Sequence, residues 1–581
     1  MLTPWFRQPT PITASRKGAL LAWVGVLLFP TLLFTLLGCA GPDGSRAQVV
    51  SGVVRAEDGA PVSGATVRAQ TTTHSTTSGR DGRFSLSVSE LGEQLELTAW
   101  ASGYTIGGPV SVRPGDTDVD LELHAHATAD NPNYQWLTSL RRPGEDDDKG
   151  CANCHSAEGS GLAHGLPVDE WQEDAHGNSA RNPHFLTLYL GTDMRGNQSP
   201  PTQYVSKKDY GTEPLKPDPT LPYYGPGYKL DFPDTAGNCA ACHTPAAASA
   251  APYDTNPTGL KGVAAEGIPC DFCHKVWDVI LDPQTGLPTQ NMPGVLSYQF
   301  RRPPQGHQFF AGPFYDVAPG DDTFSLLQTQ SQFCAPCHFG VFWDVVVYDS
   351  FGEWLRSPYS DPDNGRTCQE CHMPRLGVDH FALPGQGGLT RDPATIFSHR
   401  MPGASDEYLL RNAVSMTVTA TIEGGLLQVQ VMITNDKTGH HVPTDSPLRH
   451  LILLVSAEDE TGELLAQQDG PRLPDWCGVG APDQGHYAGQ PGLVYAKVLA
   501  EQWTNKSPTA AYWNPTYLVS DNRLAPFDSD VTDYSFDTRN QGPVSIHVRL
   551  LYRRAFIELA EQKGWQTPDI LMEEAILEIL P

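Results

Sequence analysis

The string Cys-x-x-Cys-His occurs five times in this chain, and its residue types and spacing suit one particular chemistry. Two thiols separated by two residues can form thioether bonds with two vinyl groups on one edge of a porphyrin, while the adjacent imidazole ligates the iron. The pattern therefore predicts five covalently bound haem c groups. The residues assigned to them are Cys151, Cys154, His155, Cys239, Cys242, His243, Cys270, Cys273, His274, Cys334, Cys337, His338, Cys368, Cys371 and His372.

Structural zinc is the alternative for such strings, because paired cysteines with a histidine also bind Zn²⁺. Ten of the twelve cysteines lie in the five strings, and each string carries its histidine at the same place. This regularity favours haem attachment over zinc. Of the two remaining cysteines, we expect Cys477 to be a buried core residue.

The sixth ligand of each iron decides whether a haem carries electrons or binds a substrate. Six histidines outside the motifs lie within 127–405, more than the five irons need, and the C-terminal region adds others. This supply favours haems closed by two histidines, which transfer electrons. The candidates are His164, His176, His184, His307, His380, His399, His440, His441 and His450.

The N-terminus has the pattern of an export signal. Three basic residues (Arg7, Arg16 and Lys17) precede an apolar run over 19–37, and Leu-Leu-Gly leads into Cys39. This ending resembles the bacterial lipobox, which implies lipidation of Cys39 and an outer or outward-facing membrane location. The alternative is an uncleaved membrane anchor, for which the run is just long enough. Export agrees with haem attachment, which takes place outside the cytoplasm in bacteria.

Length and charge bound the remaining possibilities. A chain of 581 residues predicts about three domains. Removing residues 1–38 takes away three basic and no acidic residues, so the formal net charge changes from −28 to −31. Nucleic acid is excluded as a partner, since phosphate binding requires the opposite sign. A positively charged redox partner is compatible with this charge, as is simple solubility.

The segment 48–126 has the alternation of half-buried strands, with apolar residues at Phe84, Leu86 and Val88 and polar residues between them. Gly-containing turn signals separate such runs. The stretches VSGVVRAEDGAPVSGATVRAQ, SGRDGRFSLSV and LTAWASGY resemble the carboxypeptidase regulatory-like domain. The resemblance implies a transthyretin-like β-sandwich that acts as a spacer or docks to a protein or glycan.

The haem region, 127–405, is expected to be mostly irregular and helical. Its motifs start at residues 151, 239, 270, 334 and 368, so the second and third lie close in sequence, as do the fourth and fifth. We predict that these two pairs are also neighbours in space. Stacking across the pairs is the alternative.

Several segments resemble the multihaem cytochrome c family with a cytochrome c-554-like haem domain: DEWQEDAHGNSARNPHF, GVAAEGIPCDFCHKV, TCQECHMP, SHRMPGAS and NDKTGHHVPTDSPLR. The resemblance implies that His176, His399 and His440 are distal ligands. His307 is the fourth choice, and His184 or His164 the fifth. One departure is Asp445, where the family pattern has glycine.

The region 406–581 is predicted to be a β-sandwich-like domain. Apolar residues alternate over 414–422 and again over 427–433, with a Gly-Gly turn between them, which predicts a hairpin. Residues 544–552 supply another strand. Thr567-Pro568-Asp569 has the pattern of a helix start, but the apolar residues that follow leave helix and strand open.

The sequence thus predicts a signal peptide (1–38), a tether (39–47), a regulatory-like β-sandwich (48–126), a pentahaem domain (127–405) and a C-terminal β-domain (406–581). The expected function is electron transfer outside the cytoplasm, from a lipid-anchored protein to redox partner proteins or an extracellular acceptor. The alternative is an oxidoreductase that acts on a small nitrogen or sulfur compound at one open haem.

Overall fold

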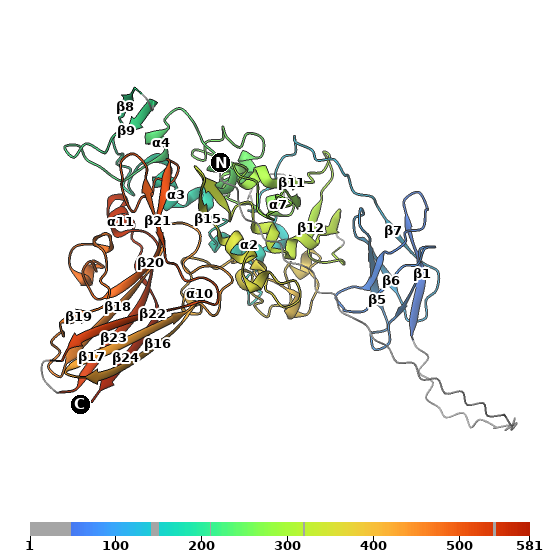
Figure 1. The fold of residues 1–581 in the computed structure, drawn as a ribbon. Coiled ribbons are helices and arrows are strands. Elements are labelled where there is room, and N and C mark those ends of the chain that lie inside the picture. The colour runs from blue at the N-terminus through green and yellow to red at the C-terminus, as the bar shows by residue number, and fades with distance from the viewer. Residues whose placement is uncertain (1–47, 141–149, 209–210, 318–319, 539–541, 581) are drawn as a thin grey trace, which may run out of the picture. The chain divides into compact units, whose positions relative to one another are not determined.

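The computed structural model describes residues 48–140, 150–208, 211–317, 320–538 and 542–580. The predicted signal peptide and tether, including Cys39, lie outside these ranges. Strands form most of the two end regions, and short helices and loops form the middle region (Figure 1). Within the described ranges, no helix has the length and apolar character needed to cross a membrane.

The N-terminal region is a β-sandwich, as predicted. One sheet has the order β4-β1-β7 and the other β3-β2-β5-β6. Alternate residues such as Phe84, Leu86 and Leu121 point into a core shared with Val67 and Leu97 of the second sheet. The strands are β1 (Val49–Ala56), β2 (Thr66–Ala69), β3 (Ser75–Thr77), β4 (Arg83–Ser87), β5 (Leu95–Trp100), β6 (Gly107–Val112) and β7 (Val119–Leu123).

The middle region is built from short helices, none longer than eight residues among those described. Four coincide with motifs: α1 (Ala152–His155), α5 (Ala240–His243), α7 (Cys270–Cys273) and α9 (Cys368–His372), and a 3-10 helix, Ser331–Cys334, leads into the remaining motif. Residues three and four apart share one face of a helix, so a single turn aims both cysteines and the histidine in one direction. The other helices are α2 (Pro167–Glu173), α3 (Pro183–Leu190), α4 (Tyr228–Asp231), α6 (Pro245–Ala248) and α8 (Ser350–Leu355).

Two-stranded sheets connect these helices. The pairs are β8 (Tyr204–Lys207) with β9 (Gly211–Pro214), β10 (Val276–Val279) with β11 (Tyr298–Phe300), β12 (Phe310–Gly312) with β13 (Asp322–Phe324), and β14 (Gly340–Phe342) with β15 (Val345–Tyr348).

The C-terminal region begins with the predicted hairpin. Strands β16 (Ser415–Glu423) and β17 (Leu426–Thr434) pair antiparallel across Gly424 and Gly425, whose φ angles of 60° and 82° suit glycine. Two sheets, β16-β17-β22-β19 and β21-β20-β18-β23-β24, enclose a common core. Their remaining strands are β18 (His450–Asp459), β19 (Gln467–Asp469), β20 (Gly492–Glu501), β21 (Thr516–Asp521), β22 (Ser529–Asp537), β23 (Val544–Arg553) and β24 (Ile570–Ile579).

The segment after Thr567, which the sequence left open between helix and strand, is strand β24. It pairs with β23 along its whole length, and this long-range pairing outweighs the local helix-start pattern. The helices of this region are α10 (Glu407–Arg411) and α11 (Ile557–Lys563). Cys477 is fully buried in a second core with Ile452 and Leu473, as expected.

Candidate haem-binding site

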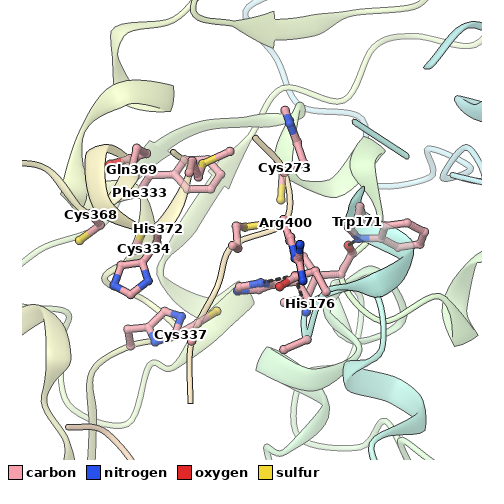
Figure 2. A pocket seen from close by; sticks show the side chains of 18 of the residues that line it. Trp171, His176, Cys273, Phe333, Cys334, Cys337, Cys368, Gln369, His372 and Arg400 are labelled. Carbon is pink, nitrogen blue, oxygen red and sulfur yellow. Dashed lines mark hydrogen bonds and ion pairs between the residues drawn. The ribbon is translucent and has the colours of Figure 1, made fainter. Parts of the chain in front are cut away.

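One continuous cavity of about 1840 Å³ runs through the middle region, and all fifteen cysteines and histidines of the five motifs line it. Ordinary small-molecule pockets measure about 300–1000 Å³, so this cavity has room for more than one large group. Its wall also includes many aromatic side chains. Figure 2 shows part of it, with Cys334, Cys337 and His372 on one side and His176 and Trp171 on the other.

Hydrogen bonds from outside the motifs set the start of two motif helices. The backbone N–H of Cys270 donates to Ser139 Oγ at 3.1 Å, and that of Cys368 donates to Ser331 Oγ at 2.9 Å. Thr367 and Glu370 also form a capping box at the start of α9. These contacts satisfy N–H groups that a helix start leaves without partners, and they orient the first thiol of these two motifs.

Three of the motif histidines are held by backbone carbonyls. Nδ1 of His155 lies 2.7 Å from the oxygen of Phe381, Nδ1 of His274 lies 2.8 Å from that of Ala311, and Nδ1 of His372 lies 2.7 Å from that of Pro402. A carbonyl only accepts, so Nδ1 carries the proton and donates it. Nε2 then keeps its lone pair for a metal, which is the usual arrangement of a ligating histidine.

His338 differs, because a carboxylate faces its Nδ1: Asp445 Oδ2 lies 3.5 Å away. Burial lowers the pKa of His338, but Asp445 outweighs it and raises the pKa to about 9. Burial lowers the pKa of the four other motif histidines, to about 4 for His243 and His372. Four of the five imidazoles are therefore kept neutral, as a ligand must be, and His338 would release one proton on binding a metal.

Two motif histidines each face a second histidine. The ring centroids of His176 and His338 are 6.2 Å apart with 62° between the planes, and those of His372 and His440 are 6.2 Å apart with 22°. Metal–nitrogen bonds of about 2 Å on each side, with about 1 Å from each nitrogen to its ring centroid, place two imidazoles on one ion about 6 Å apart. Both spacings fit two imidazoles that would hold one iron between them.

The other predicted distal residues have different surroundings. His399 lines the cavity, and burial together with His274 and His155 lowers its pKa to about 4, so it lies near the first and third motifs. His184 also lines the cavity, but its ring packs on Trp565 at 4.5 Å. His307 does not line the cavity; its side chain is 67% exposed, near Asp321. His164 lies 3.9 Å from Asp379 at the edge of the region.

Cysteines of different motifs contact one another. Cys151 lies beside Cys270, Cys242 beside Cys337, and Cys334 beside Cys368. The fourth and fifth motifs are therefore neighbours, as predicted. The second and third share a core through Ala240, Ala241 and Phe272. Contacts also cross the predicted pairs, which makes the fourth motif a junction between the second and the fifth.

Sequence reasoning missed the groups that hold the ring nitrogens. Asp174 Oδ2 accepts from Nδ1 of His176 at 2.7 Å, and its position two residues before His176 was a signal that could have been used. Asp445 has no such signal, because its partner His338 lies far away in the sequence. Backbone φ at Asp445 is 69°, so the turn keeps the left-handed conformation for which the family pattern has glycine.

Comparison with known proteins first places the N-terminal segment. Residues 49–124 match the family model of the carboxypeptidase regulatory-like domain, and this segment is such a domain. No curated protein matches the chain.

Among solved structures, the chain is similar to a penta-heme cytochrome c552 from Thermochromatium tepidum. The two are 19% identical, the match covers 74% of this chain and 97% of that one, and the TM-score is 0.49. A type II cohesin–X-dockerin complex from Acetivibrio cellulolyticus matches 14% of this chain and 58% of its own, with 22% identity and a TM-score of 0.12.

Proposed function

We propose that this protein is an exported, lipid-anchored c-type cytochrome with five covalently bound haems that carries electrons between redox partners outside the cytoplasm. The observation that carries the proposal is that all five motifs open into one continuous cavity. Five separate zinc sites would need no shared space. When bound, haem iron closed by two imidazoles exchanges single electrons and leaves no position for a substrate.

The residues present fit this cofactor. Each motif turn presents two thiols and an imidazole to the cavity, and carbonyl oxygens fix the required tautomer at His155, His274 and His372. His176 lies 6.2 Å from His338 and His440 lies 6.2 Å from His372, centroid to centroid, so each pair would hold one iron. Aromatic side chains such as Trp171 and Phe351 exclude water from the cavity wall, which lets small differences in hydrogen bonding set different potentials.

The first test is a haem count. The purified exported protein should give five haems per chain by the pyridine haemochrome spectrum, and its mass should exceed that of the polypeptide by five haem groups. Cys39 is proposed as the lipid anchor, so a Cys39→Ala variant should move from the membrane fraction to the soluble fraction with its haems retained. A haem-free protein containing zinc would overturn the proposal.

A second candidate function is suggested by the second motif. His243 stacks on Phe185 with centroids 3.8 Å apart and 4° between the planes. Among the described residues no histidine ring pairs with His155, His243 or His274, but His399 lies near His155 and His274. The cavity wall also carries Arg449, Tyr348 and Tyr512, groups that donate hydrogen bonds to anions. This arrangement favours an open site for a small nitrogen or sulfur compound.

Ligand titration followed by EPR separates the two functions. Five low-spin haems that do not respond to cyanide or nitric oxide support the electron carrier. A high-spin signal that responds to either ligand supports the oxidoreductase. Deleting residues 48–126 and measuring partner binding and electron transfer separately tests whether the N-terminal domain docks a protein or glycan.

A further inference from the structure

The two histidine pairs differ in what holds their outer ring nitrogens. In the pair His372 and His440, both Nδ1 atoms face backbone carbonyls, at 2.7 Å and 2.9 Å. In the pair His176 and His338, both Nδ1 atoms face carboxylates. Asp174 Oδ2 lies 2.7 Å from His176, and Asp445 Oδ2 lies 3.5 Å from His338.

Both carboxylates are well shielded from water. The side chain of Asp174 is 2% exposed and that of Asp445 is 18% exposed, so bulk solvent weakens their fields little. Asp174 has a second contact, because it accepts the backbone N–H of His176 at 2.7 Å. Arg449 lies 3.9 Å from Asp445 and offsets part of its charge. Asp174 has the shorter contact to its histidine and is expected to act more strongly.

A carboxylate that accepts the outer N–H of a ligating imidazole makes that imidazole a stronger donor to the metal. A stronger donor and a nearby negative charge both stabilise the more positive oxidation state, so the potential falls. A carbonyl oxygen does the same more weakly, because it carries only a partial charge. Two carboxylates on one pair should therefore lower the potential of that site below the others.

We propose that Asp174 and Asp445 make the fourth site the most reducing of the five, an inference that rests on the proposed haem function. The fourth motif is also the junction between the second and the fifth, through the contacts Cys242 to Cys337 and Cys334 to Cys368. The site of lowest potential is therefore central. Electron transfer from the second site to the fourth is therefore unfavourable in free energy, and transfer from the fourth to the fifth is favourable. Asp174 and Asp445 are positioning residues that set the size of this difference.

Potentiometric titration followed by absorption and EPR tests the inference on the full-length protein. Asp174→Asn should raise the most negative of the five midpoint potentials and leave the other four in place. Asp445→Asn should raise the same potential, with smaller shifts at the second and fifth sites, because the charge of Asp445 also acts on His243 and His440. The double variant should raise the lowest potential further. Asp174→Glu should restore the original value. Asp379→Asn is the matched control, because Asp379 pairs with His380 at 2.8 Å outside the cavity and should shift no potential.

Two results would overturn the inference while leaving the haem proposal intact. One is that the Asn variants keep five haems with the lowest potential unchanged. The other needs no aspartate variant: if His440→Met, which replaces a ligand of the fifth site, abolishes the lowest potential, that potential belongs to the fifth site. Absence of haem in the wild-type protein would instead overturn the proposed function itself.

Discussion

The imidazoles of His372 and His440 face each other with their centroids 6.2 Å apart and 22° between their planes. His372 ends helix α9 of the middle region, whereas His440 follows β17 of the C-terminal sheets. The C-terminal region therefore contributes a residue to the candidate site. It is part of the proposed electron-transfer unit, and changes in either region should affect the same haem.

His440→Ala should convert one low-spin haem to high-spin, because the fifth iron loses its second imidazole. EPR and the absorption spectrum would show one changed site out of five. His307→Ala is the control, since that side chain is exposed and lies outside the cavity, and its spectra should match the wild type. Unchanged spectra for His440→Ala would remove His440 from the ligand set.

The loop that carries His440 is held by the buried carboxylate of Glu353. Its Oε2 accepts from the backbone N–H of His441 at 3.1 Å and from Thr444 Oγ1 at 2.5 Å, and its Oε1 lies 2.8 Å from Arg523. Burial alone would raise the pKa of Glu353, but the contacts with His441 and Arg523 hold it well below its usual range.

Glu353→Gln should lower the free energy of unfolding by about 1.5–3 kcal/mol, because Arg523 loses the carboxylate of Glu353 and keeps only that of Asp521. Chemical denaturation measures this loss, and the fifth haem should become partly high-spin as the loop loosens. Glu407→Gln is the comparison, since it breaks an exposed pair with Arg411 and should cost less than about 1 kcal/mol. Equal costs for the two variants would contradict the role of Glu353.

Lys563 fastens α11 to the middle region. Its side chain is fully buried, and Nζ donates to the carbonyl oxygens of Thr187, Thr192 and Pro226 at 3.1, 3.1 and 2.6 Å. Lys563→Met keeps most of the apolar stem but leaves these carbonyls without a donor, at a cost of about 1–3 kcal/mol for each that stays dry. The melting temperature should fall clearly, whereas Lys506→Met, at an exposed pair with Glu558, should leave it nearly unchanged.

His450 makes stability depend on pH. Burial, assisted by Arg553, lowers its pKa from the usual 6.5 to about 3, and its Nδ1 donates to the oxygen of Leu448. The imidazole takes up a proton near pH 6.5 in the unfolded chain but not in the folded chain. The contribution of His450 to the stability of the fold is therefore complete above pH 6.5. It is lost as the pH falls towards 3, by about 1.4 kcal/mol per pH unit.

His450→Phe, which cannot take up a proton, should flatten this decline. Urea unfolding at pH 7, 5.5 and 4.5 compares the two proteins, and other groups cancel in the difference. The free energy of unfolding of the variant, relative to that of the wild type, should increase as the pH falls. A difference in free energy of unfolding that stays constant with pH would show that His450 does not titrate in this range.

The local patterns of the sequence predicted the parts of this protein whose partners are near in the chain. The five motifs place both thiols and the imidazole within one helical turn, so their common direction needs no distant contact. The Gly424-Gly425 hairpin and the alternation in β4 and β7 are likewise local. These features sufficed to predict the two β regions and to propose the cofactor class.

Only the tertiary structure decided which groups meet across the chain. The sequence named both His440 and His307 as distal candidates, and only folding separates them, because His440 lies beside His372 whereas the side chain of His307 is exposed. Strand β24 forms because folding brings β23 beside it. In the same way, folding brings the carboxylate of Asp445 beside His338. Which histidine faces each motif, and how strong the electric field at each imidazole is, depend on burial and on distances between residues far apart in the chain. The spacing of residues within one short motif determines neither.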